Sequence, residues 1–153
     1  AQPHIKRLFL EEKENGITNF RKVVNISSTS GMFGNAGQIN YATAKAGVVG
    51  MAKTMAKEWG RYNVNVNAVG FGLIKTRLTD ADAEKEESLI DIEGNKIKVG
   101  VNSAVFQSAK TMIPLGRPGT SQEAAGAIYM FCIPESNYVT GQILMCHGGG
   151  FGY

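Results

Sequence analysis

Apolar positions in the first part of the chain follow two different periods, and each period predicts a different element. Residues 3–13 place apolar side chains at helical spacing, and Gly16 follows as a stop. The β-branched run at residues 22–27 is typical of a buried strand. Residues 28–37 are rich in Ser, Gly and Asn, which predicts a loop. We therefore expect a short helix, a strand and a polar loop in succession.

A longer run of apolar and small residues follows at helical spacing over residues 40–60, and Gly60 ends it. Gly47 and Gly50 each lower the helix propensity by about 1 kcal/mol relative to Ala. We expect them where another helix or the sheet approaches closely. Residues 64–69 then repeat the strand pattern. Strand, helix and strand in this order form a βαβ unit, which predicts parallel strands and a right-handed crossover.

The periodicity is weaker in the part of the chain that follows. Residues 79–88 form a polar helical pattern, and residues 90–99 form two short apolar runs around a Gly-Asn pair. The second pattern predicts a hairpin. We expect the wider segment 79–113 to act as a substrate loop or flap over a site.

The residue pattern in the last part of the chain predicts one helix and one strand. Ser121 is suited to cap a helix that runs to about Cys132, and residues 143–146 are a short apolar run. We expect this last strand to join the other two in one parallel sheet, with the 40–60 helix on one of its faces.

Composition is consistent with one globular domain. The chain has 153 residues, of which 43% are apolar and 19% charged, enough for a core and unlike a disordered or fibrous protein. Its net charge of +3 comes from basic residues spread among acidic ones, so we expect no nucleic-acid partner. No apolar run approaches the roughly 20 residues that span a bilayer. We expect no membrane partner.

Cysteine and histidine positions indicate no metal or redox site. Cys132 and Cys146 lack CxxC spacing, and His4 and His147 lie near opposite ends of the chain. We expect the cysteines to be buried and structural. The first residues show no signal-peptide pattern, so a cytoplasmic protein is expected. Because the sequence starts without Met and inside a predicted helix, we also expect further sequence upstream of Ala1.

Tyr41 and Lys45 are the first candidates for chemistry. They lie at positions i and i+4 of the long predicted helix, so their side chains share one face. A positive charge beside a phenol favours its ionised form, and a helix N-terminus adds partial positive charge. Such a tyrosine can donate or accept a proton near neutrality.

Ser28 is the next candidate, because it follows the first predicted strand directly. The polar loop after it can fold back and bring its hydroxyl near the phenol of Tyr41. In open α/β sheets, ligands bind at these carboxyl ends of the strands. We therefore expect Ser28, Tyr41 and Lys45 to converge on one cleft.

Several stretches in this order resemble the classical short-chain dehydrogenase/reductase family, and within it the 3-oxoacyl-[acyl-carrier-protein] reductase-like members. The matching stretches are VVNISSTSG (23–31), GNAGQINYATAKAGVVGMAKTMAKEWG (34–60), VNVNAVGFGLIKTRLT (64–79), PLGRPGTSQEAAGA (114–127) and YVTGQILMCHGGG (138–150). The resemblance implies the C-terminal half of a doubly wound Rossmann-type parallel sheet, an α/β fold.

The resemblance also implies roles for individual residues. Ser28 would polarise a substrate carbonyl or hydroxyl, Tyr41 would be the general acid/base, and Lys45 would favour the ionised tyrosine and hold the nicotinamide ribose. In the segment after the second strand, backbone groups at Gly72 and Ile74 and the hydroxyl of Thr76 would contact the cofactor. The implied cofactor is NADP or NAD.

Two departures from the family pattern stand out. Phe71 occupies the position where the family usually has proline, which puts the shape of the nicotinamide pocket in doubt although the turn should survive. Nothing before Ser28 matches the TGxxxGxG phosphate loop, the NNAG segment or the catalytic asparagine. The glycines at 148–152 do not replace that loop, because no helix follows them. Residues 1–153 therefore read as a partial domain that holds the catalytic half, with the N-terminal dinucleotide-binding half absent.

The function expected on these grounds is hydride transfer between nicotinamide and a carbonyl/alcohol carbon of a small molecule, of the 3-oxoacyl reductase type. The 153-residue chain by itself is expected to have little activity. One alternative is a non-catalytic truncated remnant that serves as an oligomerisation module, and another is an epimerase or dehydratase that shares YxxxK. Helices like those at 3–13 and 40–60 pack across a two-fold interface in this family, so a homo-oligomer is expected.

Overall fold

The computed structural model describes residues 2–76, 89–92, 95–98, 108–109 and 111–150. Its helices and strands run in the order α1 (Gln2–Glu14), β1 (Arg21–Ser28), α2 (Thr29–Phe33), α3 (Ile39–Trp59), η1 (Gly60–Tyr62), β2 (Val64–Phe71), β3 (Ile74–Lys75), β4 (Leu89–Ile92), β5 (Asn95–Lys98), β6 (Gly119–Thr120), α5 (Ser121–Tyr129), η4 (Pro134–Ser136) and β7 (Ile143–Cys146).

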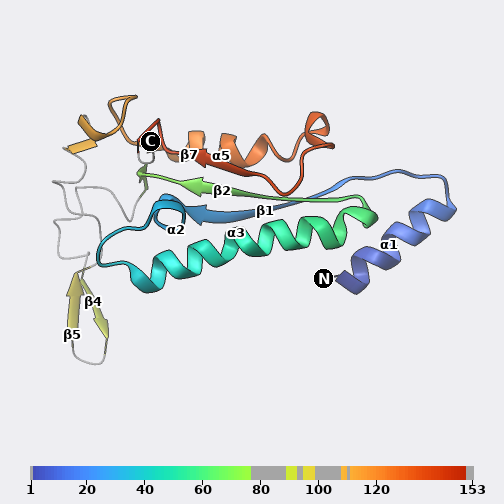
Figure 1. Cartoon of the computed structure of the whole chain (residues 1–153), viewed down its shortest axis with the longest axis horizontal. Helices are drawn as coiled ribbons and strands as arrows, with labels where there is room; N and C mark the ends of the chain where they lie inside the picture. The colour runs from blue at the N-terminus through green and yellow to red at the C-terminus, as the bar shows by residue number, and fades with distance from the viewer. Residues whose placement is uncertain (1, 77–88, 93–94, 99–107, 110, 151–153) are drawn as a thin grey trace.

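A three-stranded parallel sheet with order β1-β2-β7 forms the centre of the chain. Figure 1 shows α3 along one face of this sheet and α5 along the other. The predicted parallel strands and the predicted long helix are therefore confirmed. Helices on both faces of a parallel sheet define half of a doubly wound α/β fold.

Strand β2 contributes side chains to the hydrophobic cores on both faces of the sheet, because successive side chains point to opposite faces. Val66 and Ala68 pack against Ala52 of α3, whereas Val69 packs against Ala127 of α5. Val66 and Val69 are fully buried, and burying a valine side chain contributes about 1.5–3 kcal/mol. A polar residue at either position would therefore disrupt the contact between the sheet and one helix.

Two buried asparagines in β2 fix the segment that leads into β7. The amide Nδ2 of Asn67 donates to Val139 O at 3.0 Å, and its Oδ1 accepts from Gln142 N at 2.9 Å. Asn65 Nδ2 donates to the carbonyl oxygens of Asn137 and Val139. Asparagine is unfavourable in strands, but hydrogen-bonded amides can be buried. These bonds set the position of β7 beside β2.

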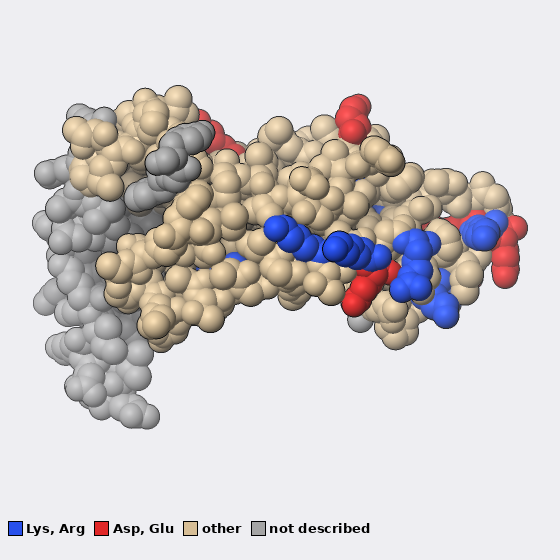
Figure 2. Space-filling view, viewed as in Figure 1, with Lys and Arg blue, Asp and Glu red and all other residues tan. Residues whose placement is uncertain are grey.

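Helix α1 has no buried residue; Ile5 packs against the core cluster on that side of the sheet, and a ring contact and an ion pair add to this attachment. The rings of Phe9 and Tyr62 meet edge to face with centroids 5.8 Å apart. Arg21 donates to both carboxylate oxygens of Glu12 at 2.6 and 2.9 Å. This pairing with Arg21 lowers the pKa of Glu12. Figure 2 shows that the charged side chains on the viewed face gather over α1 and the adjoining part of α3, whereas the α2 end is largely uncharged.

The helix termini differ from the sequence-based expectation at two places. The start of the expected loop 28–37 forms helix α2, because the Ser28 hydroxyl accepts from the backbone N–H of Ser30 and caps the helix. The cap of α5 is Thr120 rather than Ser121, because Thr120 and Glu123 form a reciprocal capping box. Helix α5 also ends at Tyr129, before the expected end near Cys132.

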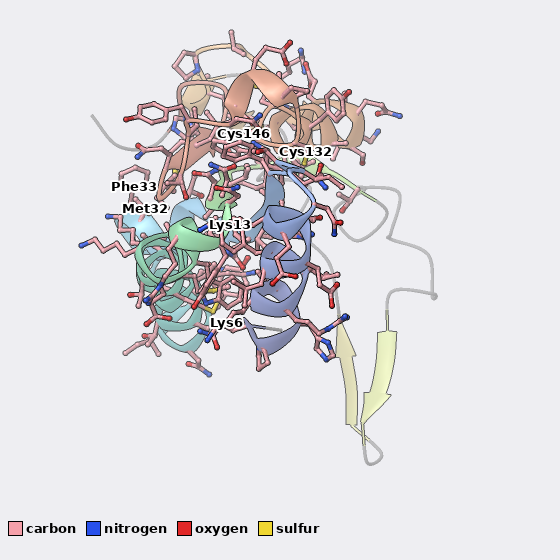
Figure 3. All side chains as sticks on the ribbon, turned by 90° about the vertical axis from the view of Figure 1, so that its right-hand side faces the viewer. Lys6, Lys13, Met32, Phe33, Cys132 and Cys146 are labelled. Carbon is pink, nitrogen blue, oxygen red and sulfur yellow. The ribbon has the colours of Figure 1, made fainter. Side chains whose placement is uncertain are left out.

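The surroundings of Gly47, Gly50 and Cys132 differ from the expectation within one chain. A Cβ added at Gly47 or Gly50 would meet nothing within 4 Å among the described residues, and approach by a second copy of the chain stays a prediction. The Cys132 thiol is exposed rather than buried, and Cys146 is partly buried; Figure 3 labels both. Apolar neighbours in the sequence did not predict the exposure of Cys132, which lies beyond the last residue of α5.

The hairpin predicted at residues 90–99 is confirmed, because β4 pairs antiparallel with β5 from Leu89–Lys98 to Ile92–Asn95. The helix predicted at residues 79–88 lies outside the described residues. Most of the proposed flap, residues 79–113, also lies outside them, so its function stays a prediction.

Candidate active site

A cavity of about 730 Å³ lies where β1 and β2 end. The end of β1, helix α2 and the start of α3 form its polar side. The turn after β2, residues 108–109 and 112–113, and the inner face of α5 form the rest of its wall. The predicted site residues Ser28, Tyr41, Gly72, Ile74 and Thr76 all line it. The cavity is therefore at the carboxyl ends of parallel strands, where open α/β sheets bind ligands.

Ser28 is the last residue of β1 and is 8% exposed. Its Oγ accepts a hydrogen bond from Ser30 N at 3.2 Å, which is the N-cap bond of α2. A hydroxyl that accepts through one lone pair keeps its own hydrogen for another partner. Ser28 can therefore donate into the cavity while its orientation is held by α2.

Tyr41 lies in the first turn of α3, and 47% of its surface is exposed. No side chain caps this helix end, since its N-cap residue makes no cap hydrogen bond. The backbone N–H groups of the first turn carry partial positive charge. The phenol is thus placed at a cavity wall beside the positive end of a helix.

Lys45 lies behind Tyr41, and it is not among the residues that line the cavity. Its Nζ is 5.7 Å from the centroid of the Tyr41 ring and donates to the carbonyl oxygen of Ile26 at 3.1 Å. An ammonium over an aromatic ring is attracted by the ring's negative face. The structure therefore brings Ser28 and Tyr41 to one cavity and places the Lys45 charge against the tyrosine.

The backbone of Lys45 fixes α3 against β1 and α2. Its carbonyl oxygen accepts from Ser27 Oγ at 2.8 Å. A Cβ at Gly31 of α2 would lie 2.6 Å from the carbonyl carbon of Lys45, so α2 and α3 meet where only glycine fits. These two contacts set the separation between the serine at the end of β1 and the tyrosine at the start of α3.

The turn after β2 survives with Phe71 in the usual proline position, as expected. Phe71 is paired with Ser28 on one side and Cys146 on the other. Gly72 N then donates to Cys146 O at 3.0 Å. A Cβ at Gly72 would lie 2.6 Å from the Cβ of His147, so a side chain at this position would displace the end of β7.

The cavity has a polar end and an apolar wall. Ser30 and Gln38 stand beside Ser28 and Tyr41 at the polar end, whereas Met112, Ile113 and Ile128 belong to the apolar wall. Two hydroxyls facing one cavity can donate to the same substrate oxygen, and an apolar wall suits a carbon chain. The arrangement can polarise a carbonyl group and transfer a proton to its oxygen.

Sequence analysis missed Ser30, Gln38 and the apolar wall. The available signal for the two polar residues was their spacing, because Ser30 follows Ser28 by two positions and Gln38 precedes Tyr41 by one helical turn. For the wall no signal was available, since it combines segments far apart in the sequence.

Among the described residues, the charged groups with clearly shifted pKa values lie outside the cavity lining. Arg117 and then the Thr120 backbone lower the pKa of Glu123 to about 2. Burial lowers the pKa of Lys22, whose Nζ donates to Ser136 Oγ at 3.1 Å. In the described part of the chain, no group of three or more His, Cys, Asp or Glu side chains is arranged to hold a metal ion. Its helices are also too short or too polar to cross a membrane.

Residues 11–150 match a family model described as enoyl-(acyl carrier protein) reductase. The 3-oxoacyl-[acyl-carrier-protein] reductase of Thermotoga maritima is 42% identical over 127 residues, which are 83% of this chain and 44% of the relative. The corresponding reductase of Synechocystis is 35% identical over 146 residues, 95% of this chain and 48% of the relative. This chain spans about half the length of the curated relatives it matches.

Solved structures show the same fold. A short chain dehydrogenase from Bacillus anthracis aligns with a TM-score of 0.65 and 30% identity, over 94% of this chain and 49% of the other. A 4-hydroxyisoleucine dehydrogenase complexed with NADH aligns with a TM-score of 0.66 over 94% of this chain and 51% of the other, and at 22% identity it supports the fold alone. The expected half of a doubly wound Rossmann-type sheet is therefore confirmed.

Proposed function

This chain belongs to the short-chain dehydrogenase/reductase family, and from that premise we propose that the intact protein containing it is an NAD(P)-dependent reductase of the 3-oxoacyl type. The reaction would transfer a hydride between nicotinamide and a carbonyl/alcohol carbon. The observation that carries the proposal is that Ser28 and Tyr41 line one cavity, with Lys45 Nζ 5.7 Å from the tyrosine ring.

In the reductive direction, the substrate oxygen accepts hydrogen bonds from the Ser28 and Tyr41 hydroxyls. A bound nicotinamide would supply the hydride for the carbonyl carbon. As the electron pair of the C=O π bond moves to oxygen, Tyr41 gives its proton to that oxygen and becomes a phenolate. The Lys45 ammonium favours the phenolate, and Ser28 stabilises the negative charge that develops on the substrate oxygen.

The described residues fit the nicotinamide end of NADP or NAD. Gly72, Ile74 and Thr76 line the same cavity as the hydroxyl residues Ser28 and Tyr41. In this proposal Tyr41 and Lys45 hold the ribose, and Gly72, Ile74 and Thr76 contact the nicotinamide end. Phosphate groups need backbone amides at a glycine-rich turn and a helix N-terminus, which no segment before Ser28 supplies. That part of the cofactor site would lie in sequence outside this chain.

The proposal includes a homo-oligomer in the cytoplasm and a small carbonyl compound as substrate. Leu8 and Leu10 of α1 and Met51 of α3 are large apolar side chains that are 37–45% exposed, which suits a packed interface between copies. The alternative of a non-catalytic oligomerisation module gains no support from the comparisons, since the relatives are named as reductases.

The test is reduction of an acetoacetyl ester by the purified intact gene product, followed as loss of NADPH or NADH absorbance. Tyr41→Phe removes the transferable proton and should lower kcat by roughly 10²-fold or more. Tyr138→Phe makes the same change at a fully exposed tyrosine outside the cavity lining and should leave kcat unchanged. Equal activity of wild type and Tyr41→Phe would refute the assigned role.

A further inference from the structure

After β7 and His147, the chain continues as three consecutive glycines, residues 148–150, which we call the glycine tail. The tail lies against residues 112–115, which we call the wall segment. The backbone N–H of Leu115 donates to Gly148 O at 3.1 Å. Cβ atoms added at the second and third glycines would lie 3.1 and 3.2 Å from atoms of the wall segment. The tail therefore packs against the wall segment along its whole length.

Gly148 makes the closest of these contacts. Its φ is +64°, a backbone conformation that residues with a side chain rarely adopt. A Cβ at this position would lie 2.7 Å from Ile113 Cγ2, well inside van der Waals contact. Cγ2 is bonded directly to the β-carbon of Ile113, and β-branched side chains have little freedom about χ1, so this methyl group cannot easily swing aside. Position 148 therefore requires a residue without a side chain if Ile113 is to keep its place.

Ile113 lies between the glycine tail and the cavity. It is 4% exposed and belongs to the apolar wall of the cavity. Its backbone N–H donates to the carbonyl oxygen of Ala109, a buried residue of the same wall, at 3.0 Å. Protein interiors are close-packed, so a buried side chain that is pushed yields towards empty space. The empty space beside Ile113 is the cavity, and a group added at position 148 would press Ile113 into it.

The glycine tail begins at a fixed point of the sheet. Cys146 ends β7, and its carbonyl oxygen accepts from Gly72 N at 3.0 Å. His147 packs so closely on Gly72 that a Cβ at Gly72 would lie 2.6 Å from His147 Cβ. Gly150 N donates to His147 O at 3.2 Å and closes the turn that the tail makes. Because these contacts fix the tail, Ile113 is the part that moves when the two collide.

We propose that Gly148 is a positioning residue that sets the width of the cavity through Ile113, and so limits the length of the carbon chain that the site accepts. The inference rests on the proposed function, in which the reacting carbonyl is held by Ser28 and Tyr41. With that end of the substrate fixed, the carbon chain extends along the apolar wall. A side chain at position 148 would narrow the cavity there, so long chains would be excluded before short ones.

The experiment uses the intact gene product with NADPH or NADH and two esters, ethyl acetoacetate and ethyl 3-oxooctanoate, which differ only in the length of the carbon chain. The quantity compared is kcat/KM for the longer ester divided by kcat/KM for the shorter one. Gly148→Ala adds the colliding methyl group. Ile113→Leu conserves the side-chain volume but has no methyl group on its β-carbon, so the double variant should relieve the collision.

Gly141→Ala is the matched control. Gly141 has nearly the same backbone conformation, with φ of +71°, so alanine causes the same kind of strain there. A Cβ at Gly141 would lie 3.5 Å from Ala56 Cβ, which is ordinary contact, and Gly141 is outside the cavity lining. The control therefore separates backbone strain from displacement of Ile113.

The ratio is expected to fall about tenfold in Gly148→Ala, mainly through a higher KM for the longer ester, because apolar pockets discriminate single methylene groups by about this factor. In the Ile113→Leu background the same substitution should change the ratio little. Gly141→Ala should keep the wild-type ratio even if it lowers the Tm. Ile113→Val widens the wall but keeps the Cγ2 methyl group, and it should raise the ratio with the tail unchanged.

A role in folding alone would lower the rates with both esters equally, so an unchanged ratio in Gly148→Ala would overturn the inference. A fall that persists in full in the Ile113→Leu background would overturn it as well. If Gly148→Ala does not fold, Ile113→Val decides, since a raised ratio supports the inference and an unchanged ratio overturns it. Reduction of neither ester by the wild type would instead overturn the proposed function, and this inference with it.

Discussion

Ser28 and Phe71 are the last paired residues of the neighbouring parallel strands β1 and β2, and both line the cavity. By the alternation along each strand they lie on the face that carries α5. Phe71 also packs near Ile128 and Cys146, partly buried members of the cluster on that face. The aromatic ring is thus shared by the hydrophobic core and the wall of the candidate site.

Truncation of this ring should affect stability and the site together. Phe71→Ala is expected to lower the free energy of unfolding by roughly 2–4 kcal/mol, because it leaves a cavity next to Val69 and Ala127. It should also raise KM by enlarging the pocket. Chemical denaturation and steady-state kinetics measure the two effects. Phe33→Ala, at a phenylalanine that projects from α2 with 49% exposed, is the control (Figure 3) and should change neither quantity much.

Glycine at position 31 should be required for the spacing of the two hydroxyls. In Gly31→Ala the new methyl group would meet backbone atoms of Lys45 and Ala46 at 2.6–2.7 Å, so α2 must move away from α3. We expect a loss of about 1–3 kcal/mol in stability and a lower kcat. Gly126→Ala on α5 meets nothing within 4 Å and should raise stability by about 0.5–1 kcal/mol. A Gly31→Ala variant as stable and active as wild type would show that the contact does not constrain the site.

Removing the Lys45 ammonium near the Tyr41 ring should lower kcat more than it lowers the stability of the fold. Lys45→Met keeps most of the side-chain volume but takes away the ammonium near the Tyr41 ring. The phenolate formed by proton transfer loses its stabilising charge, so kcat should fall by roughly 10²-fold. Lys53→Met, at an exposed position two turns further along α3, is the matched control and should retain wild-type kcat. A similar kcat in both variants would contradict the role given to Lys45.

The ion pair at the start of α5 should make stability depend on pH. The Arg117 guanidinium donates to both carboxylate oxygens of Glu123 at 2.6 and 2.8 Å and lowers the pKa of this carboxyl from 4.5 to about 2. A lowered folded-state pKa contributes stability above the ordinary pKa, and that contribution is lost as pH falls from about 4.5 towards 2.

Glu123→Gln keeps the capping geometry and removes the charge. Its Tm should therefore be lower than that of wild type at pH 7, and the difference should shrink as the pH falls below 4.5. Thermal unfolding followed by circular dichroism at several pH values measures this. A Tm difference that stays constant down to pH 2 would show that the ion pair does not contribute.

Strong periodic patterns made the main elements predictable from sequence. The β-branched run of β1, the buried strand β2 and the long amphipathic α3 carry clear signals, and their order alone implied a parallel sheet. Helix α2 was missed because five residues rich in Ser, Thr and Gly carry no period. The cap of α5 was placed one residue late because Thr120 and Ser121 are equally good caps by type, and only the bond to Glu123 separates them.

Only those residues of the candidate site that belong to sequence motifs were predicted. Ser28, Tyr41 and the glycine turn at 72 were found from spacing and resemblance, and the structure places them around one cavity. The place of Gln38 in the cavity lining was missed, because its hydrogen bond to Ser30 exists only once α2 folds against α3. No described residue of the same chain packs closely on Gly47, because helix propensity says nothing about where neighbouring elements lie.

Transfer of a labelled hydride tests the central claim most directly. Intact protein is incubated with an acetoacetyl ester and NADPH or NADH carrying deuterium on both C4 positions, and the product is analysed by mass spectrometry and NMR. We predict one deuterium on the carbon that carried the reacting carbonyl, and almost no labelled product with Tyr41→Phe. A reduced product without deuterium at that carbon, or no reduced product from the wild-type protein, would contradict the account.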